Sequence, residues 1–252
     1  MHLPEIADPW AHLRKFTAAR IAIGRSGGSQ PTAAVLDFRL AHARARDAVH
    51  APFHPEKISV PLESAGIPTR LLATTLTDRQ TYLLRPDLGR SLHPDSVAQL
   101  HPGDFDLAII VSDGLAAAAA ENHAAAVLVP LIAALRVAGW KIAPILLIPL
   151  ARVKIQDEIG HALRARFTLM LLGERPGLGT PDSLGAYFTR NPSPDCTDAE
   201  RNCVSNIRPE GIPPAQAAAK LAWLLQESAL LGLGGIYLKD NQPAIMPVQT
   251  GW

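Results

Sequence analysis

Cysteine is scarce in this sequence, and the two cysteines form no recognisable pattern. Only Cys196 and Cys203 occur in 252 residues, so a disulfide scaffold is not indicated and a reducing compartment fits. There is no Cys-x-x-Cys pair and no Cys/His spacing typical of zinc. The segment Asp157-Glu158-Ile159-Gly160-His161 lacks the first histidine of His-Glu-x-x-His. We therefore expect no metal site built from these residues.

The chain also lacks a charge imbalance and long apolar runs. Lys and Arg number 24 against 23 Asp and Glu, a formal net charge of +1, which gives no electrostatic case for a nucleic acid or an acidic membrane as partner. The longest apolar stretch, residues 143–150, is too short to span a bilayer and contains Pro144 and Pro149. Residues 1–10 show neither the basic nor the apolar region of a secretory signal. These observations predict a cytoplasmic protein.

Apolar runs alternate with helical patterns from about residue 67 onward. Strands are expected at 69–76, 106–111, 141–148, 167–172 and 235–239. Helices are expected at 95–100, 115–138 (bent or broken near Pro130), 155–164 and 214–231, and a helix or turn at 79–85. This alternation predicts an α/β fold with a doubly wound, mainly parallel, Rossmann-like sheet and helices on both faces.

The first part of the chain has a different pattern. Helices are expected at 8–20, with Asp8 as N-cap, and at 33–49, followed by a Pro- and Gly-punctuated connector at 51–68. We therefore predict an N-terminal helical arm with its connector, residues 1–60, and a Rossmann-like domain, residues 61–252.

Three polar loops follow predicted strands: residues 112–114, 151–153 and 174–177. The carboxyl ends of parallel strands meet at one edge of a sheet, where ligands of open α/β sheets bind. Asp113 is favoured as the N-cap of the Ala-rich helix. Glu174 either pairs with Arg175 or presents its acceptor oxygens to the crevice, and the sequence leaves both readings open.

No group of residues makes a self-sufficient active site. The Gly24–Gly28 loop lacks the ending of a P-loop and follows no predicted strand, so a turn is favoured over a phosphate cradle. Cys203 has no histidine nearby in sequence to act as base, which argues against a nucleophile. We assign no catalytic residue and favour a subunit that binds a cofactor or partner. A stand-alone nucleotide- or sugar-phosphate-binding protein and a purely structural adaptor are the alternatives.

Ordered blocks along nearly the whole chain carry a family resemblance. They include Phe16-Thr17-Ala18-Ala19-Arg20, Val111-Ser112-Asp113-Gly114-Leu115, Arg152-Val153, Gly173-Glu174-Arg175-Pro176-Gly177 and Arg201-Asn202-Cys203-Val204-Ser205-Asn206. In these blocks the chain closely resembles the small subunit of adenosylcobalamin-dependent ethanolamine ammonia-lyase. Lys154 and Gln156 depart from the family's small residues after Arg152-Val153 and leave the packing of the following helix open.

The resemblance implies a partner and a cofactor. In that family a TIM-barrel large subunit holds the substrate, and the small subunit covers adenosylcobalamin, bound base-on, at the mouth of the barrel. Ethanolamine is converted by radical chemistry to acetaldehyde and ammonia, and the protein supplies binding and confinement. The family's small-subunit contacts to cobalamin match Val153, Glu174 and Cys203 here. The resemblance also gives a bacterial microcompartment as an alternative location within the cytoplasm.

Overall fold

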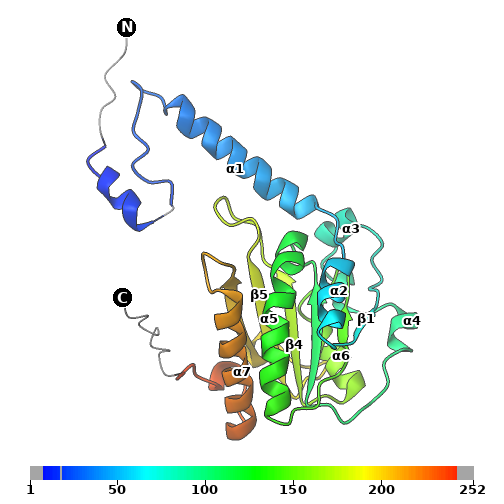
Figure 1. Cartoon of the computed structure of the whole chain (residues 1–252). Helices are drawn as coiled ribbons and strands as arrows, with labels where there is room; N and C mark the ends of the chain where they lie inside the picture. The colour runs from blue at the N-terminus through cyan, green and yellow to red at the C-terminus, as the bar shows by residue number, and fades with distance from the viewer. Residues whose placement is uncertain (1–7, 18, 243–252) are drawn as a thin grey trace.

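The computed structural model describes residues 8–17 and 19–242 and is built around one six-stranded sheet (Figure 1). The strand order is β1-β3-β2-β4-β5-β6. The first four strands in this order run parallel, and β5 and β6 are antiparallel to their neighbours. The strands are β1 (Thr69–Leu71), β2 (Leu107–Ser112), β3 (Ile145–Leu147), β4 (Phe167–Gly173), β5 (Leu184–Arg190) and β6 (Arg201–Ile207).

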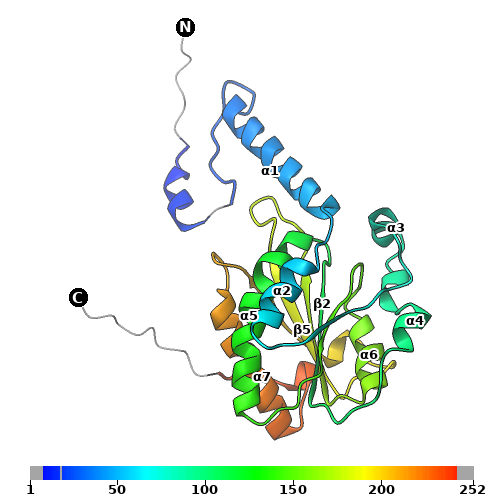
Figure 2. The same cartoon turned by 45° about the vertical axis from the view of Figure 1, so that its right-hand side comes forward.

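Both faces of the sheet are apolar, as expected where helices cover both sides. Alternate residues of β2 and β4 point to opposite faces, so Ile109 and Leu169 enter one core while Ile110 and Met170 enter the other. The helices α2 (Glu56–Ser64), α5 (Ala117–Val137) and α7 (Pro214–Leu231) cover the first face, and α6 (Ile155–Leu163) covers the second (Figure 2).

The α/β class is confirmed, but the prediction of a doubly wound Rossmann-like sheet is wrong for its second half. Neither β5 nor β6 was predicted, because no strand was expected between residues 172 and 214. The final strand predicted at 235–239 is a short 3₁₀ helix (Gly235–Tyr237). The sheet is therefore mixed: a parallel βαβ portion extended by an antiparallel β4-β5-β6 meander.

The remaining helices are α1 (Thr32–His50), α3 (Arg79–Leu84), α4 (Pro94–Val97) and 3₁₀ helices at Ala11–Phe16, Leu88–Arg90 and Asp198–Glu200. Among them, α1 is slightly longer than predicted, α3 and α4 are shorter, and the last two 3₁₀ helices were not predicted. The helix expected at 8–20 is reduced to the first of these 3₁₀ helices; Asp8 lies before it, and its carboxylate accepts a hydrogen bond from the amide of Trp10.

The Ala-rich helix α5 continues without a break through Pro130. Within the described residues it is the one helix long and apolar enough, by length and composition, to cross a membrane, yet half of its most apolar window is buried inside the protein. Small alanines allow α5 to pack closely against the sheet and against α7 beside it, which explains its apolar composition.

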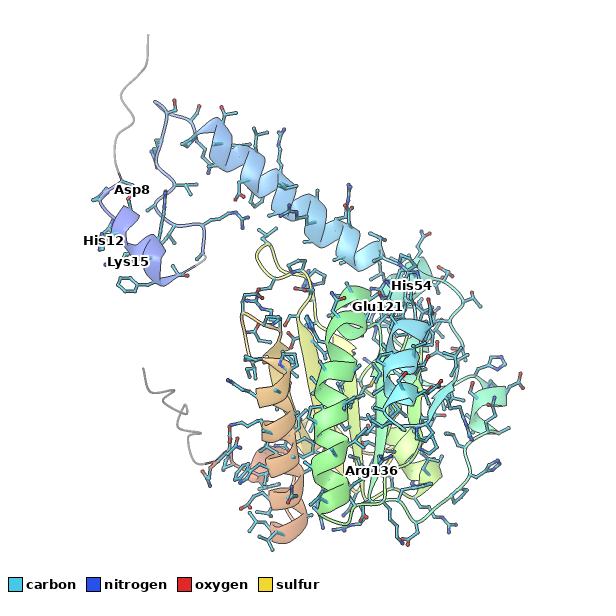
Figure 3. The ribbon with its side chains drawn as sticks, in the orientation of Figure 1. Asp8, His12, Lys15, His54, Glu121 and Arg136 are labelled. Atoms are coloured by element: carbon cyan, nitrogen blue, oxygen red, sulfur yellow. The ribbon has the colours of Figure 1, made fainter. Side chains whose placement is uncertain are left out.

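The predicted connector contains the helix α2, which the sequence analysis missed. Ile58 and Leu62 of α2 are fully buried in the core beside α5. Glu121 of α5 accepts hydrogen bonds from the amide (2.8 Å) and ring Nδ1 (3.1 Å) of His54, just before α2 (Figure 3). The division at residues 60 and 61 falls inside α2 and stays a prediction.

The helix α1 projects away from the sheet (Figure 1). Only Ala41 of its residues is buried, while Leu36, Phe38 and Leu40 are exposed. That this segment works as an arm stays a prediction.

Candidate functional site

Polar side chains gather on the α6-side face of the sheet, near the carboxyl ends of the parallel strands. Met170 of β4 pairs with Tyr187 of β5, which in turn pairs with Cys203 of β6. Paired residues share a face, so these three form a row across the sheet. Met170 is buried beneath α6, Tyr187 is half-buried and Cys203 is exposed. Cover by the helix therefore ends before Cys203 in this row.

Glu174 lies on this face directly after β4. Its amide donates to the carbonyl of Ser183 (2.9 Å), and its carboxylate accepts from the Ser183 hydroxyl and from the amide of Asn206 (3.2 Å to Oε2). Asn206 has a φ of 57°, a left-handed conformation that asparagine tolerates. The carboxylate thus holds the turn that ends β6, and it is not paired with Arg175 in this structure.

Gly185 makes the space that the Glu174 carboxylate occupies. A Cβ at this position would lie 2.9 Å from Cε2 of Tyr187 and 3.0 Å from Oε1 of Glu174. A carboxylate has about four acceptor positions, and the bonds above leave Oε1 with acceptor capacity. Glu174 can therefore accept a further hydrogen bond from a ligand on this face.

The thiol of Cys203 is kept neutral. Although Cys203 is exposed as a residue, its thiol is partly desolvated, and this desolvation raises the thiol pKa to about 11; the Tyr187 hydroxyl opposes the shift, and the nearby Glu174 charge adds to it. Burial, followed by the charges of Cys203 and Glu174, also raises the pKa of Tyr187. Because the thiolate is the reactive form, this environment argues against a nucleophile and agrees with the sequence interpretation.

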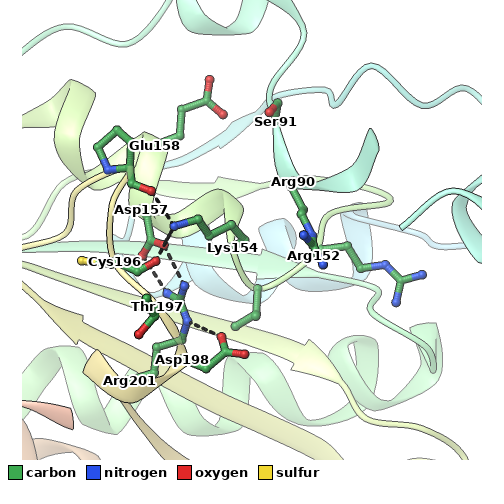
Figure 4. Close-up of a pocket in the computed structure, with 12 residues that line it drawn as sticks. Arg90, Ser91, Arg152, Lys154, Asp157, Glu158, Cys196, Thr197, Asp198 and Arg201 are labelled. Carbon is green, nitrogen blue, oxygen red and sulfur yellow. Dashed lines mark hydrogen bonds and ion pairs between the residues drawn. The ribbon is translucent and has the colours of Figure 1, made fainter. Parts of the chain in front are cut away.

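Val153 lies in the turn that leads into α6 and borders a cavity of about 720 Å³ (Figure 4). Arg201, two residues before Cys203, lines the same cavity. Arg152 turns toward α3: its Nη2 donates to the carbonyl of Tyr82 (2.8 Å), and its guanidinium stacks 3.9 Å from the Tyr82 ring centroid. This anchorage fixes the turn that carries Val153.

Asp113 is not the N-cap of α5, a position that Ala116 occupies. The Asp113 side chain, 2% exposed, pairs with Arg79 Nη1 (2.8 Å) and accepts from the amide of Leu150 (2.7 Å). Burial raises the pKa of this carboxyl, and the Arg79 charge opposes the shift. Tertiary partners from α3 and from the turn after β3 thus replace the local capping role.

Of the three predicted contact residues, Glu174 and Cys203 lie close enough for their charges to interact. Val153 borders a separate feature, the cavity that Arg201 also lines and that neither Glu174 nor Cys203 lines. Sequence reasoning missed Ser183, Gly185 and Tyr187, which lie on or beside β5. The consecutive β-favouring residues Tyr187, Phe188 and Thr189 were the available signal. No three His, Cys, Asp or Glu side chains of residues 8–17 and 19–242 gather closely enough to hold a metal.

Fold and site together define an α/β protein with an open, polar face at the carboxyl edge of a mixed sheet. Residues 7–239 match the family of the ethanolamine ammonia-lyase light chain. The chain is 51% identical to the ethanolamine ammonia-lyase small subunit of Azotobacter vinelandii over 244 residues, 94% of this chain and 90% of that protein. It is 47% identical to that of Pseudomonas fluorescens (95% and 90% covered) and 49% identical to that of Xanthomonas campestris (93% and 88% covered).

The chain belongs to the ethanolamine ammonia-lyase small-subunit family.

Proposed function

We propose that this chain is the cofactor-covering subunit of an ethanolamine ammonia-lyase. It binds adenosylcobalamin, base-on, between its open sheet face and a TIM-barrel large subunit. The observation that carries the proposal is the closeness of Glu174 and Cys203 on this face, on the same side of the sheet as Arg201, which lines the cavity that Val153 borders.

The residues of this region fit the periphery of a corrin, which is rich in amides. The space above Gly185 is filled by a carboxylate that keeps acceptor capacity, suited to an amide N–H. Cys203 is exposed as a residue but carries a neutral thiol, so it presents shape and backbone groups rather than charge. A cavity of about 720 Å³ lies in the range of small-molecule sites.

Glu174, Val153 and Cys203 would hold adenosylcobalamin, which when bound would supply the radical chemistry for the conversion of ethanolamine to acetaldehyde and ammonia. The residues of this chain bind and orient the cofactor and exclude water from it. Glu174 accepts hydrogen bonds from peripheral amides, while Val153 and Cys203 contribute shape and backbone contacts. No residue of this chain takes part in a bond-making step.

The N-terminal arm, residues 8–50, contributes to assembly with the large subunit in this proposal. Leu36 and Leu40 are separated by one helical turn on α1 and are 58% and 50% exposed. Leu178, in the loop that Glu174 begins, lies across a small cavity from α1 residues such as Phe38. This proximity supports a docking segment that lies next to the cofactor loop. The complex works in the cytoplasm, free or inside a bacterial microcompartment.

Co-expression with an ethanolamine ammonia-lyase large subunit tests the proposal. The two chains should co-purify, and only their complex should bind adenosylcobalamin and release acetaldehyde from ethanolamine. A complex that assembles but binds no cobalamin would indicate that the chain is instead a purely structural adaptor. Turnover by the large subunit alone would refute the proposal.

A further inference from the structure

A group of four charged side chains, with a buried ion pair at its centre, lies between α6 and β6. Asp157 and Arg201 form a two-bond ion pair, with Nη1–Oδ1 at 2.7 Å and Nη2–Oδ2 at 2.8 Å, and their side chains are 1% and 5% exposed. Lys154 Nζ lies 3.0 Å from the Asp157 carboxylate, and Asp198 lies 3.1 Å from Nε of Arg201 (Figure 4). The two positive and two negative charges balance.

This group joins the two segments that border the proposed cofactor surface. Asp157 lies one helical turn after Val153, and Arg201 lies two residues before Cys203 on β6. Residues two apart on a strand point to the same face, so Arg201 and Cys203 share the α6 side. The ion pair therefore spans 44 residues of sequence and connects the Val153 turn directly to the strand that carries Cys203.

The same group also orders the segment between β5 and β6. Lys154 Nζ donates to the carbonyls of Pro194 (2.7 Å) and Cys196, and Arg201 Nη1 donates to the hydroxyl of Thr189 (3.3 Å). All of these contacts lie at or beside the cavity that Val153 borders. The wall of that cavity is thus held by fixed polar contacts.

Stability alone is a poor explanation for such a group. Desolvation of two charges offsets much of their attraction, and apolar replacements of buried pairs are often neutral or stabilising. What a planar two-bond pair supplies is a defined distance and orientation. Burial opposes the charged form of Arg201, but its bonds to Asp157 and Asp198 outweigh this and raise its pKa.

We infer that Asp157 and Arg201 are positioning residues, which fix the spacing between the Val153 turn and Cys203 and thereby shape the surface that takes the cofactor. This inference rests on the proposed function. Neither residue needs to contact the cofactor, because each acts through the element it holds.

Variants that keep the charge and change the length separate positioning from stability. Asp157→Glu adds one methylene and preserves the ion pair, while Arg201→Lys keeps the charge and loses the two-bond geometry. Each is assembled with the large subunit, and two quantities are measured: the Kd for adenosylcobalamin by absorbance titration, and the Tm of the complex without cofactor.

We expect the Kd to rise about tenfold or more in both variants, the effect typical of losing a supporting contact around a site, with Tm within about 2 °C of the wild type. A Kd equal to that of the wild type in a folded complex would overturn the inference. Failure of both variants to fold would assign the pair to stability alone and overturn it too.

The matched control is Asp106→Glu. Asp106 pairs with Arg166 at 3.0 Å beside the amino-terminal ends of β2 and β4, the opposite edge of the sheet. The Kd of the Asp106→Glu complex for adenosylcobalamin should equal that of the wild type. A wild-type complex that itself binds no cobalamin would contradict the proposed function, whereas normal binding in the wild type and in both variants would contradict only the positioning role.

Discussion

Arg79 Nη1 lies 2.8 Å from Oδ2 of Asp113, so the first residue of α3 is bonded to the carboxyl end of β2. Arg79 also donates from Nη1 to the carbonyl of Gly114 (2.7 Å) and from Nε to that of Val49 (2.7 Å). One guanidinium therefore joins the end of α1 to the edge of the sheet where the candidate site lies.

Asp113→Asn should be strongly destabilising because it leaves the Arg79 charge nearly buried without its partner. We expect the free energy of unfolding to fall by about 3–5 kcal/mol, measured by urea unfolding. If Asp113 were only a helix N-cap, the same substitution would lower the free energy of unfolding by only about 1 kcal/mol. Asp104→Asn, in the exposed pair with Lys141, is the control and should leave the unfolding midpoint unchanged.

Glu174→Ala should weaken cofactor binding. A charge-assisted hydrogen bond contributes about 1.5–3 kcal/mol, so the Kd for adenosylcobalamin should rise about tenfold to a hundredfold in the reconstituted complex. Glu174→Gln keeps an acceptor oxygen and should raise this Kd by a smaller factor. Glu210→Ala removes an exposed carboxylate after β6 and should bind adenosylcobalamin with the Kd of the wild type. An unchanged Kd for Glu174→Ala would rule out the assigned role.

Cys203→Ser should retain most of the turnover of the complex, because the proposed contact depends on shape and backbone. A nucleophilic thiol would instead lose nearly all activity. Loss of turnover by several orders of magnitude in a folded Cys203→Ser complex would overturn the assignment.

The reactivity of Cys203 should depend on pH as expected for a raised thiol pKa. Alkylation of the isolated chain, followed by mass spectrometry of the Cys203 peptide, should increase with pH toward a midpoint near the pKa of about 11. Because the Glu174 charge raises this pKa, Glu174→Gln should shift the midpoint to lower pH. A midpoint at or below the ordinary thiol value in the wild type would contradict the described environment.

Removal of residues 1–50 should abolish assembly with the large subunit while the sheet domain remains folded by circular dichroism. A smaller change, Leu36→Ser with Leu40→Ser, removes exposed apolar groups and should weaken assembly without lowering the Tm of the isolated chain. Leu230→Ser, at an 81% exposed leucine on α7, is the matched control. Stoichiometric co-elution of the truncated chain with its partner in size-exclusion chromatography would refute the docking role.

The elements that were predicted correctly are those whose formation depends mainly on neighbouring residues in the sequence. The buried runs that become β2 and β4, and the uninterrupted helix α7, lie within a residue or two of their expected bounds. Pro130 was expected to bend or break α5, but packing against the sheet and α7 keeps the helix continuous. The connector was interpreted as loop because Pro55 and Pro61 suggested it, although burial of Ile58 and Leu62 stabilises α2 there.

By itself the sequence determined the α/β class and the succession along the chain of the segments that form the parallel strands. Through its ordered blocks it also determined the family. Only the tertiary structure decided that β5 and β6 run antiparallel, that Asp113 pairs with Arg79 and that Asp157 pairs with Arg201. Such pairings join residues 34 and 44 positions apart. Local propensity carries no information about a partner at that distance, because strand pairing and buried ion pairs form only when the packed sheet brings their elements together.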